Sequence, residues 1–167
     1  WTQDETALAV DKVRFVGDPV AAVAAVDEDT AVRALEAIAV EYEPLHAFLD
    51  PEESLGRTEP KIHEDKKNNV SKHVLLDFGD VDAAISGADV VVEGNFSFHS
   101  TTHAPIEPHC AVARVSPDGV LTLWSATQIT HYVHRALAKV LGLPEHQIRV
   151  IQPCLGGAFG GKSDPFS

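Results

Sequence analysis

Residues 154–163 read CLGGAFGGKS, with four glycines inside a span of six residues. The stretch follows the apolar run IRVI at 148–151, which is typical of a strand. Because glycine has no Cβ, a glycine-dense turn lets the backbone approach a ligand, and its successive N–H groups form a concavity for anionic or oxo groups. The sequence therefore predicts a ligand-contacting loop, with a tight structural turn as the alternative.

The same stretch fits the phosphate-loop formula G-x-x-x-x-G-K-S from Gly156 to Ser163. A phosphate loop opens a long helix and is followed by an acidic strand that helps to hold Mg²⁺. Here Asp164 and Pro165 follow at once. This context argues against a phosphate loop, and a nucleotide-binding module is kept as the alternative function. Stabilisation by ATP in a melting assay would support it.

Four other stretches accompany the glycine loop: GDPVAAV at 17–23, IEPH at 106–109, WSATQ at 124–128 and LGLP at 141–144. Together with the loop, and in this order and spacing, they resemble the molybdenum-binding subunit of the xanthine dehydrogenase and aldehyde oxidase family. The resemblance runs over almost the whole chain and is strongest from the WSATQ stretch to the loop. Relatives of the 4-hydroxybenzoyl-CoA reductase type are similar too.

The composition supports a folded chain, because 44% of the 167 residues are apolar. No run of about 18 apolar residues is present, so no membrane span is expected. The chain opens on Trp1 without a basic and apolar leader, so we expect a fragment or split subunit with no signal peptide. Two cysteines, Cys110 and Cys154, fit a reducing compartment, and we expect a cytoplasmic protein.

The net charge of −12 makes nucleic acid or an anionic membrane an unsuitable main partner. The charge is uneven: 21 acidic and 8 basic residues lie up to Glu93, and 4 acidic and 5 basic residues follow. This shift in composition indicates a boundary near that position, with a solvated acidic part before it.

An α+β fold is expected. In the first part of the chain, Asp29 or Thr30 caps a helix over 31–40. Strands are predicted on either side of this helix, at 12–16, 20–26 and 38–42.

In the second part of the chain, a short helix is predicted within 79–87 and a long strand over 88–99. A hairpin follows, made of 110–116 and 120–125 around Pro-Asp-Gly. A helix over 131–141 then ends at Gly142. The sheet is therefore expected to be mixed and partly antiparallel.

With the resemblance, three domain ranges are expected. Residues 1–55 are the C-terminal part of an α/β hammerhead-type domain, 56–76 a linker, and 77–167 the start of a molybdopterin-binding domain. The polar composition between 50 and 71 supports the linker, because that stretch is too poor in apolar residues to pack by itself.

The resemblance implies roles for the loop and for one glutamine. Gln128 would hydrogen-bond the oxygen ligand on molybdenum; the plainer alternative is a glutamine that ends a strand and caps the next helix. Phe159 would also contact ring-shaped substrates. The cofactor-binding residues implied are Gly156, Gly157, Ala158, Phe159 and Gly160.

Ser163 departs from the purine-oxidising pattern, which carries a glutamate directly after Gly-Gly-Lys. A hydroxyl does not replace the charge of a carboxylate, so we expect Ser163 to contact a substrate other than xanthine or hypoxanthine. Aldehydes, other N-heteroaromatic compounds, carbon monoxide and aryl-CoA thioesters stay open.

The implied cofactor is molybdopterin, which holds molybdenum through its own dithiolene, so no metal ligand is expected from this chain. The spacings of its histidines also match no tight ligand set. The implied reaction is hydroxylation or reductive dehydroxylation of a small aromatic, N-heterocyclic or aldehyde substrate. Partners implied are an iron–sulfur subunit, a flavin subunit carrying FAD, and the remaining part of the molybdenum subunit, whose general-base glutamate lies beyond Ser167. Glu107 is assigned a structural role.

Overall fold

The computed structural model describes residues 6–165, so residues 1–5 and 166–167 of the expected domains lie outside it. Contacts within the chain divide it into two units, one ending at Asn95 and the other beginning at Phe96. Within the described residues, no helix has both the length and the apolar character needed to cross a membrane.

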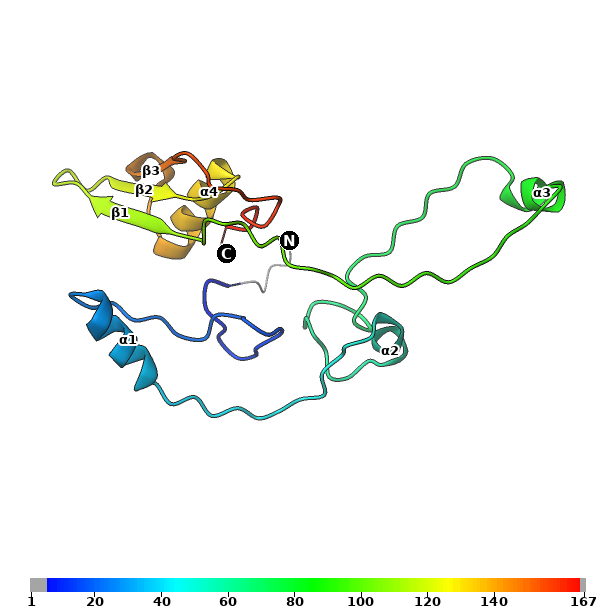
Figure 1. The fold of residues 1–167 in the computed structure, drawn as a ribbon, viewed down its shortest axis with the longest axis horizontal. Coiled ribbons are helices and arrows are strands. Elements are labelled where there is room, and N and C mark those ends of the chain that lie inside the picture. Colours follow the sequence, from blue (N-terminus) through cyan, green and yellow to red (C-terminus); the bar gives the residue numbers. More distant parts are fainter. Residues whose placement is uncertain (1–5, 166–167) are drawn as a thin grey trace. The chain divides into compact units, whose positions relative to one another are not determined.

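Unit 2, from Phe96 onward, contains a three-stranded sheet in the order β1-β2-β3 (Figure 1). The strands are β1 (Ala111–Val115), β2 (Leu121–Ser125) and β3 (Ile148–Ile151). β1 and β2 are antiparallel, whereas β2 and β3 are parallel. The predicted hairpin and the mixed, partly antiparallel sheet are therefore confirmed.

Helix α4 (Thr130–Leu141) connects the two parallel strands and packs against β3. Val133 and Ala136 are its buried residues, whereas Val140 and Leu141 near its end are half exposed. Nε2 of His134 lies 3.1 Å from the carbonyl oxygen of Ile148, which links the helix to the start of β3. Leu121, Ala126, Ile148 and Ala158 complete the small buried core of this unit.

Gly142 ends α4 as predicted, with a left-handed φ of 65° and an N–H that donates to Ala138 O. An alanine in this conformation places its Cβ too near the following carbonyl, so Gly142→Ala is expected to lower the free energy of unfolding by about 1 kcal/mol. Urea unfolding measures the change. Gly56→Ala is the control, because Gly56 has no positive φ and open space around it. Equal stability of the two variants would contradict the prediction.

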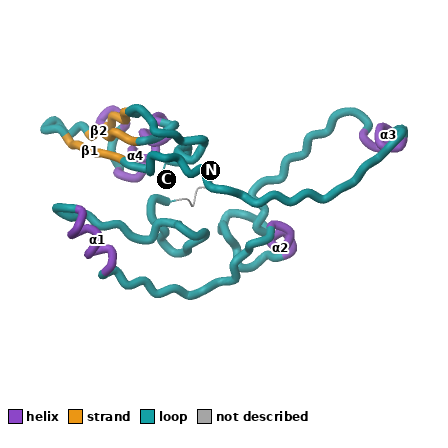
Figure 2. Tube along the Cα trace, viewed as in Figure 1, coloured by secondary structure: helices purple, strands orange, loops and turns teal. Residues whose placement is uncertain are grey.

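The described part of unit 1 contains three short helices joined by long loops (Figure 2). Helix α1 (Glu28–Glu36) begins three residues before the predicted start at Ala31, because Asp27 is its N-cap and Oδ1 of Asp27 accepts the Thr30 N–H at 2.8 Å. The predicted cap at Asp29 or Thr30 is therefore wrong, and both residues lie in the first turn. The helix also stops before the predicted end at Val40.

The other two helices of unit 1 are α2 (Pro51–Gly56) and α3 (Val81–Ser86). α3 confirms the short helix predicted within 79–87, capped by Asp80 and ended by Gly87. α2 was not predicted. Its sequence carries the usual start, with Asp50 as N-cap and Pro51 in the first turn.

The strands predicted at 12–16, 20–26, 38–42 and 88–99 are wrong for the described residues. These segments have no hydrogen-bonded strand partner there, and a strand requires a neighbour that satisfies its backbone groups. Many of their apolar side chains are exposed, among them Val92 at 88% and Phe96 at 97%.

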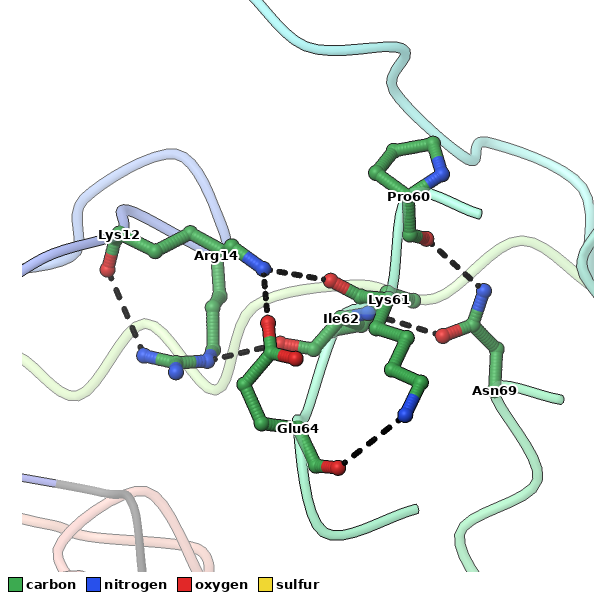
Figure 3. A network of polar contacts seen from close by, with 7 residues as sticks. All are labelled: Lys12, Arg14, Pro60, Lys61, Ile62, Glu64 and Asn69. Carbon is green, nitrogen blue, oxygen red and sulfur yellow. Dashed lines mark hydrogen bonds and ion pairs between the residues drawn. The ribbon is translucent and has the colours of Figure 1, made fainter. Parts of the chain in front are cut away.

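A network of polar contacts ties residues 60–69 to the start of unit 1 (Figure 3). Nζ of Lys12 lies 2.6 Å from Oε1 of Glu64 and donates to Lys61 O at 2.8 Å. Nε of Arg14 donates to Ile62 O at 2.8 Å. These contacts hold residues 60–69 in place, although the stretch lacks the apolar residues to pack on its own.

Candidate functional site

The candidate site lies where the two parallel strands end. Because β2 and β3 run in the same direction, their carboxyl ends lie at the same edge of the sheet, where ligands bind in many α/β proteins. Gln128 follows β2, and the glycine loop, residues 154–163, follows β3. The topology therefore brings these two predicted elements together.

Gln128 holds the second half of the glycine loop through its side-chain oxygen. Oε1 accepts the N–H of Gly160 at 3.1 Å, the N–H of Lys162 at 3.3 Å and the hydroxyl of Ser163 at 3.1 Å. Three donors around one atom fix that atom as the oxygen. The Nε2 amide of Gln128 therefore has no acceptor among residues 6–165.

Gln128 does not cap helix α4. The N-cap of that helix is Ile129, which has no side-chain cap hydrogen bond. The hydroxyl of Thr127 accepts the Ile129 N–H at 3.1 Å instead. The alternative of a helix-capping glutamine is therefore wrong.

The middle of the glycine loop presents three consecutive N–H groups. Those of Gly157, Ala158 and Phe159 have no acceptor among the described residues. The φ angles of 101° at Gly157 and 53° at Phe159 produce a sharp turn around Ala158, whose side chain is buried. Such an array of N–H groups suits an oxo or anionic group of a ligand.

The remaining predicted site residues lie around this array. The Phe159 ring is 75% exposed and lies over Gly157, where a Cβ would be 3.1 Å from it. The N–H of Gly160 is already donated to Gln128, and the hydroxyl of Ser163 is used in the same way. Gly156 instead contacts Glu107, which donates its own N–H to Gly156 O at 3.3 Å.

The sequence reasoning missed an ion pair beneath the loop. Nζ of Lys162 lies 2.6 Å from Oε2 of Glu107, and the same oxygen accepts the Gly156 N–H at 3.0 Å. Lys162 is 1% exposed and is the largest fully buried side chain among the described residues. The sequence offered one indication of this ion pair. Few charged residues follow Glu93, and Glu107 lies between Ile106 and Pro108, so a buried carboxylate there would need one of the few basic residues as its partner.

The hydrogen bond from Lys162, followed by the hydrogen bond from the Gly156 N–H, holds the pKa of Glu107 below its ordinary value. The unfolded chain therefore binds the proton more tightly than the folded chain. Stability from this contact is fully present above the ordinary carboxyl pKa and is lost as the pH falls through the lowered one.

We expect Glu107→Gln to remove this pH dependence. The difference in unfolding free energy between the unaltered protein and the variant should be constant near neutral pH and shrink in acid, below the ordinary carboxyl range. Urea unfolding over a pH series measures it. A difference that stays constant into acid would contradict the expectation.

The geometry of Lys162 argues against the nucleotide alternative. In a phosphate loop the lysine reaches the phosphates, but here its ammonium is buried against Glu107. The segment after the loop forms turns to Pro165 instead of a helix. Neither the lysine nor the helix N-terminus of a phosphate loop is therefore available.

Two other features of the described residues, the metal-ligating side chains and a hollow in unit 1, offer no second site. Among residues 6–165, no group of three or more histidine, cysteine, aspartate or glutamate side chains is arranged to hold a metal ion. A hollow of about 960 Å³ lies within unit 1, lined by residues from three segments between Ala9 and Ile62. We assign this hollow no chemistry.

Comparison with known protein families identifies the family of this chain. Residues 62–167 match the molybdopterin cofactor-binding domain, and residues 1–46 match the aldehyde oxidase and xanthine dehydrogenase a/b hammerhead domain. The two matches occur in the order that the resemblance implied. The chain belongs to the aldehyde oxidase and xanthine dehydrogenase family of molybdopterin-binding proteins.

Individual relatives support the same family assignment. The nicotinate dehydrogenase large molybdopterin subunit of Eubacterium barkeri is 43% identical over 162 residues, which cover 97% of this chain and 38% of the relative. The carbon monoxide dehydrogenase large chain of Afipia carboxidovorans is 33% identical over 177 residues, covering 98% of this chain and 22% of the relative. This chain therefore spans well under half the length of either relative.

Among solved structures, the aldehyde oxidoreductase from Desulfovibrio gigas is similar, with a TM-score of 0.69 and 28% identity. The similarity covers 81% of this chain and 15% of that one.

Proposed function

We propose that this chain is the part of a molybdenum-containing oxidoreductase that presents the glycine loop to molybdopterin. The observation that carries the proposal is the set of three N–H groups at Gly157, Ala158 and Phe159, which have no acceptor in the described part of the chain. The Gly160 N–H joins this array to Gln128, whose Nε2 donor is also open. Backbone and amide donors bind an oxo group without adding charge.

The proposed roles of the site residues build on these contacts. The N–H groups of residues 157–159 would hold the cofactor, and Nε2 of Gln128 would donate a hydrogen bond to it. Gly156 and Gly160 hold the two ends of the array through Glu107 and Gln128. Bound molybdopterin supplies the redox chemistry.

The substrate proposed is a small aromatic, N-heterocyclic or aldehyde compound that is hydroxylated or reductively dehydroxylated. The exposed ring of Phe159 provides a surface for a planar substrate. The relative named for nicotinate supports an N-heterocycle. Ser163 offers a hydroxyl where a carboxylate would suit a purine, although its proton is donated to Gln128 in this structure.

The proposal extends to the assembly. Iron–sulfur and FAD-carrying subunits receive the electrons, and the remaining part of the molybdenum subunit supplies the general base. Two free, exposed cysteines fit a reducing compartment, and we place the complex in the cytoplasm. The domain ranges 1–55, 56–76 and 77–167 stand as part of this proposal.

The test is the molybdenum and pterin content of the complex purified with its native partners. We expect near-stoichiometric molybdenum, pterin and accompanying iron. An intact complex without molybdenum would overturn the proposal.

A further inference from the structure

Glu107 contacts both ends of the glycine loop. Its backbone N–H and its Oε2 hydrogen-bond the carbonyl and the N–H of Gly156, at the start of the loop. The same Oε2 binds the ammonium of Lys162, near its end. One residue outside the loop thus fixes the separation of two positions six residues apart.

Lys162 is in turn hydrogen-bonded to Gln128. The N–H of Lys162 donates to Oε1 of Gln128 at 3.3 Å, and the carbonyl of Lys162 accepts the Gln128 N–H at 2.9 Å. The Thr127 hydroxyl also donates to this carbonyl, at 3.4 Å. Glu107, Lys162 and Gln128 therefore form one connected path around the three open N–H groups.

The ion pair is better suited to fixing geometry than to adding stability. The Lys162 side chain has no exposed surface, and that of Glu107 is 29% exposed. Removing an ammonium from water offsets most of the attraction between the two charges, so a buried pair contributes little net stability. Once it is formed, however, breaking it leaves an uncompensated buried charge.

We propose that Glu107 and Lys162 are positioning residues, whose ion pair sets the arrangement of the open N–H groups of residues 157–159 relative to Gln128. The ion pair acts on the loop and does not contact the substrate. The expected effect of the ion pair on cofactor binding rests on the proposed function. Its effect on the conformation of the glycine loop does not.

The test uses the native complex with three substitutions: Lys162→Met, Glu107→Gln and both together. Glu107→Gln leaves a fully buried ammonium without its counter-charge and should have the larger effect. Amide hydrogen exchange at Gly156 and at residues 160–163, whose N–H groups are hydrogen-bonded, should accelerate by about tenfold or more in this variant, and less in Lys162→Met. The double variant removes both charges, so its exchange should return towards the unaltered rate.

The matched control is Lys12→Met. It removes an ion pair of the same 2.6 Å length, between Lys12 and Glu64 in unit 1. It should leave exchange in the loop unchanged.

A second readout is the split between kcat and KM, together with the molybdenum content. Misplaced N–H groups should lower kcat per bound molybdenum in the single variants, and the double variant should recover part of it. Unchanged exchange at Gly156 and at residues 160–163 in both single variants would overturn the positioning role. Absence of molybdenum from the unaltered complex would overturn the proposed function alone, because the exchange rates still report on the ion pair.

Discussion

Replacing Gln128 by glutamate is expected to abolish most of the proposed oxidoreductase activity of the complex, while the glycine loop keeps its conformation. A carboxylate oxygen can still accept the Gly160 and Lys162 N–H groups and the Ser163 hydroxyl, and it does so more strongly than an amide oxygen. The other oxygen replaces the Nε2 donor by a charged acceptor. Loss of one such donor in other enzymes lowers kcat about 100-fold or more, and we expect a loss of that order.

Gln128→Leu is the matching variant, because leucine removes both the acceptor and the donor. Three loop donors then lose their partner, at about 1 kcal/mol for each hydrogen bond. Amide exchange at Gly160 and Lys162 should therefore accelerate in Gln128→Leu and stay slow in Gln128→Glu, with kcat measured in parallel. Full activity in Gln128→Glu would show that Nε2 has no role as a donor.

The second large effect is expected at Gly156. A Cβ at this position would lie 2.6 Å from Cβ of Glu107, closer than real Cβ atoms approach, and neither atom is the flexible end of a side chain. Gly156→Ala should therefore push the loop away from Glu107 and disturb the ion pair with Lys162. Overpacking of this kind costs about 1 to 3 kcal/mol. The complex should also lose bound molybdenum.

Urea unfolding and molybdenum content measure the effect of Gly156→Ala. Gly56→Ala is the control, since its Cβ meets no atom within 4 Å. A stable variant with full molybdenum content would mean that the contact with Glu107 yields easily, and it would weaken the positioning role of that residue.

The elements that the sequence predicted well depend on local information. The hairpin follows from alternating apolar residues around Pro117-Asp118-Gly119, where Gly119 adopts a φ of 83°. Helix α4 follows from its apolar spacing and from the stop at Gly142. In both cases, residues close in sequence determine the backbone.

The errors in unit 1 have two physical causes. The start of α1 depends on which polar side chain caps its first turn, and Asp27 does so where Asp29 or Thr30 was expected. The predicted strands have apolar residues in plausible positions, but a strand also needs a neighbouring strand, which no local pattern provides. The alternation of side chains in residues 88–99 indicated an extended segment, but it did not indicate whether another strand pairs with that segment.

For the candidate site, the resemblance pointed to Gln128 and the loop, and the parallel pairing of β2 with β3 explains why they meet. The contact of Glu107 with Lys162 joins residues 55 positions apart. The sequence indicated Lys162 only as part of the glycine-loop stretch and of the phosphate-loop formula, and Glu107 only as a structural residue. A pair so distant in sequence could not be deduced from spacing.

The exposed apolar side chains of residues 88–99 have a practical consequence for production of the protein. Val92 and Phe96 belong to a segment whose backbone has no strand partner in the described part of the chain. Such segments bind chaperones or other copies of themselves when they are synthesised alone. Co-expression with the proposed partner subunits is therefore the preferable route to a homogeneous sample, and refolding of the isolated chain is expected to end in aggregates.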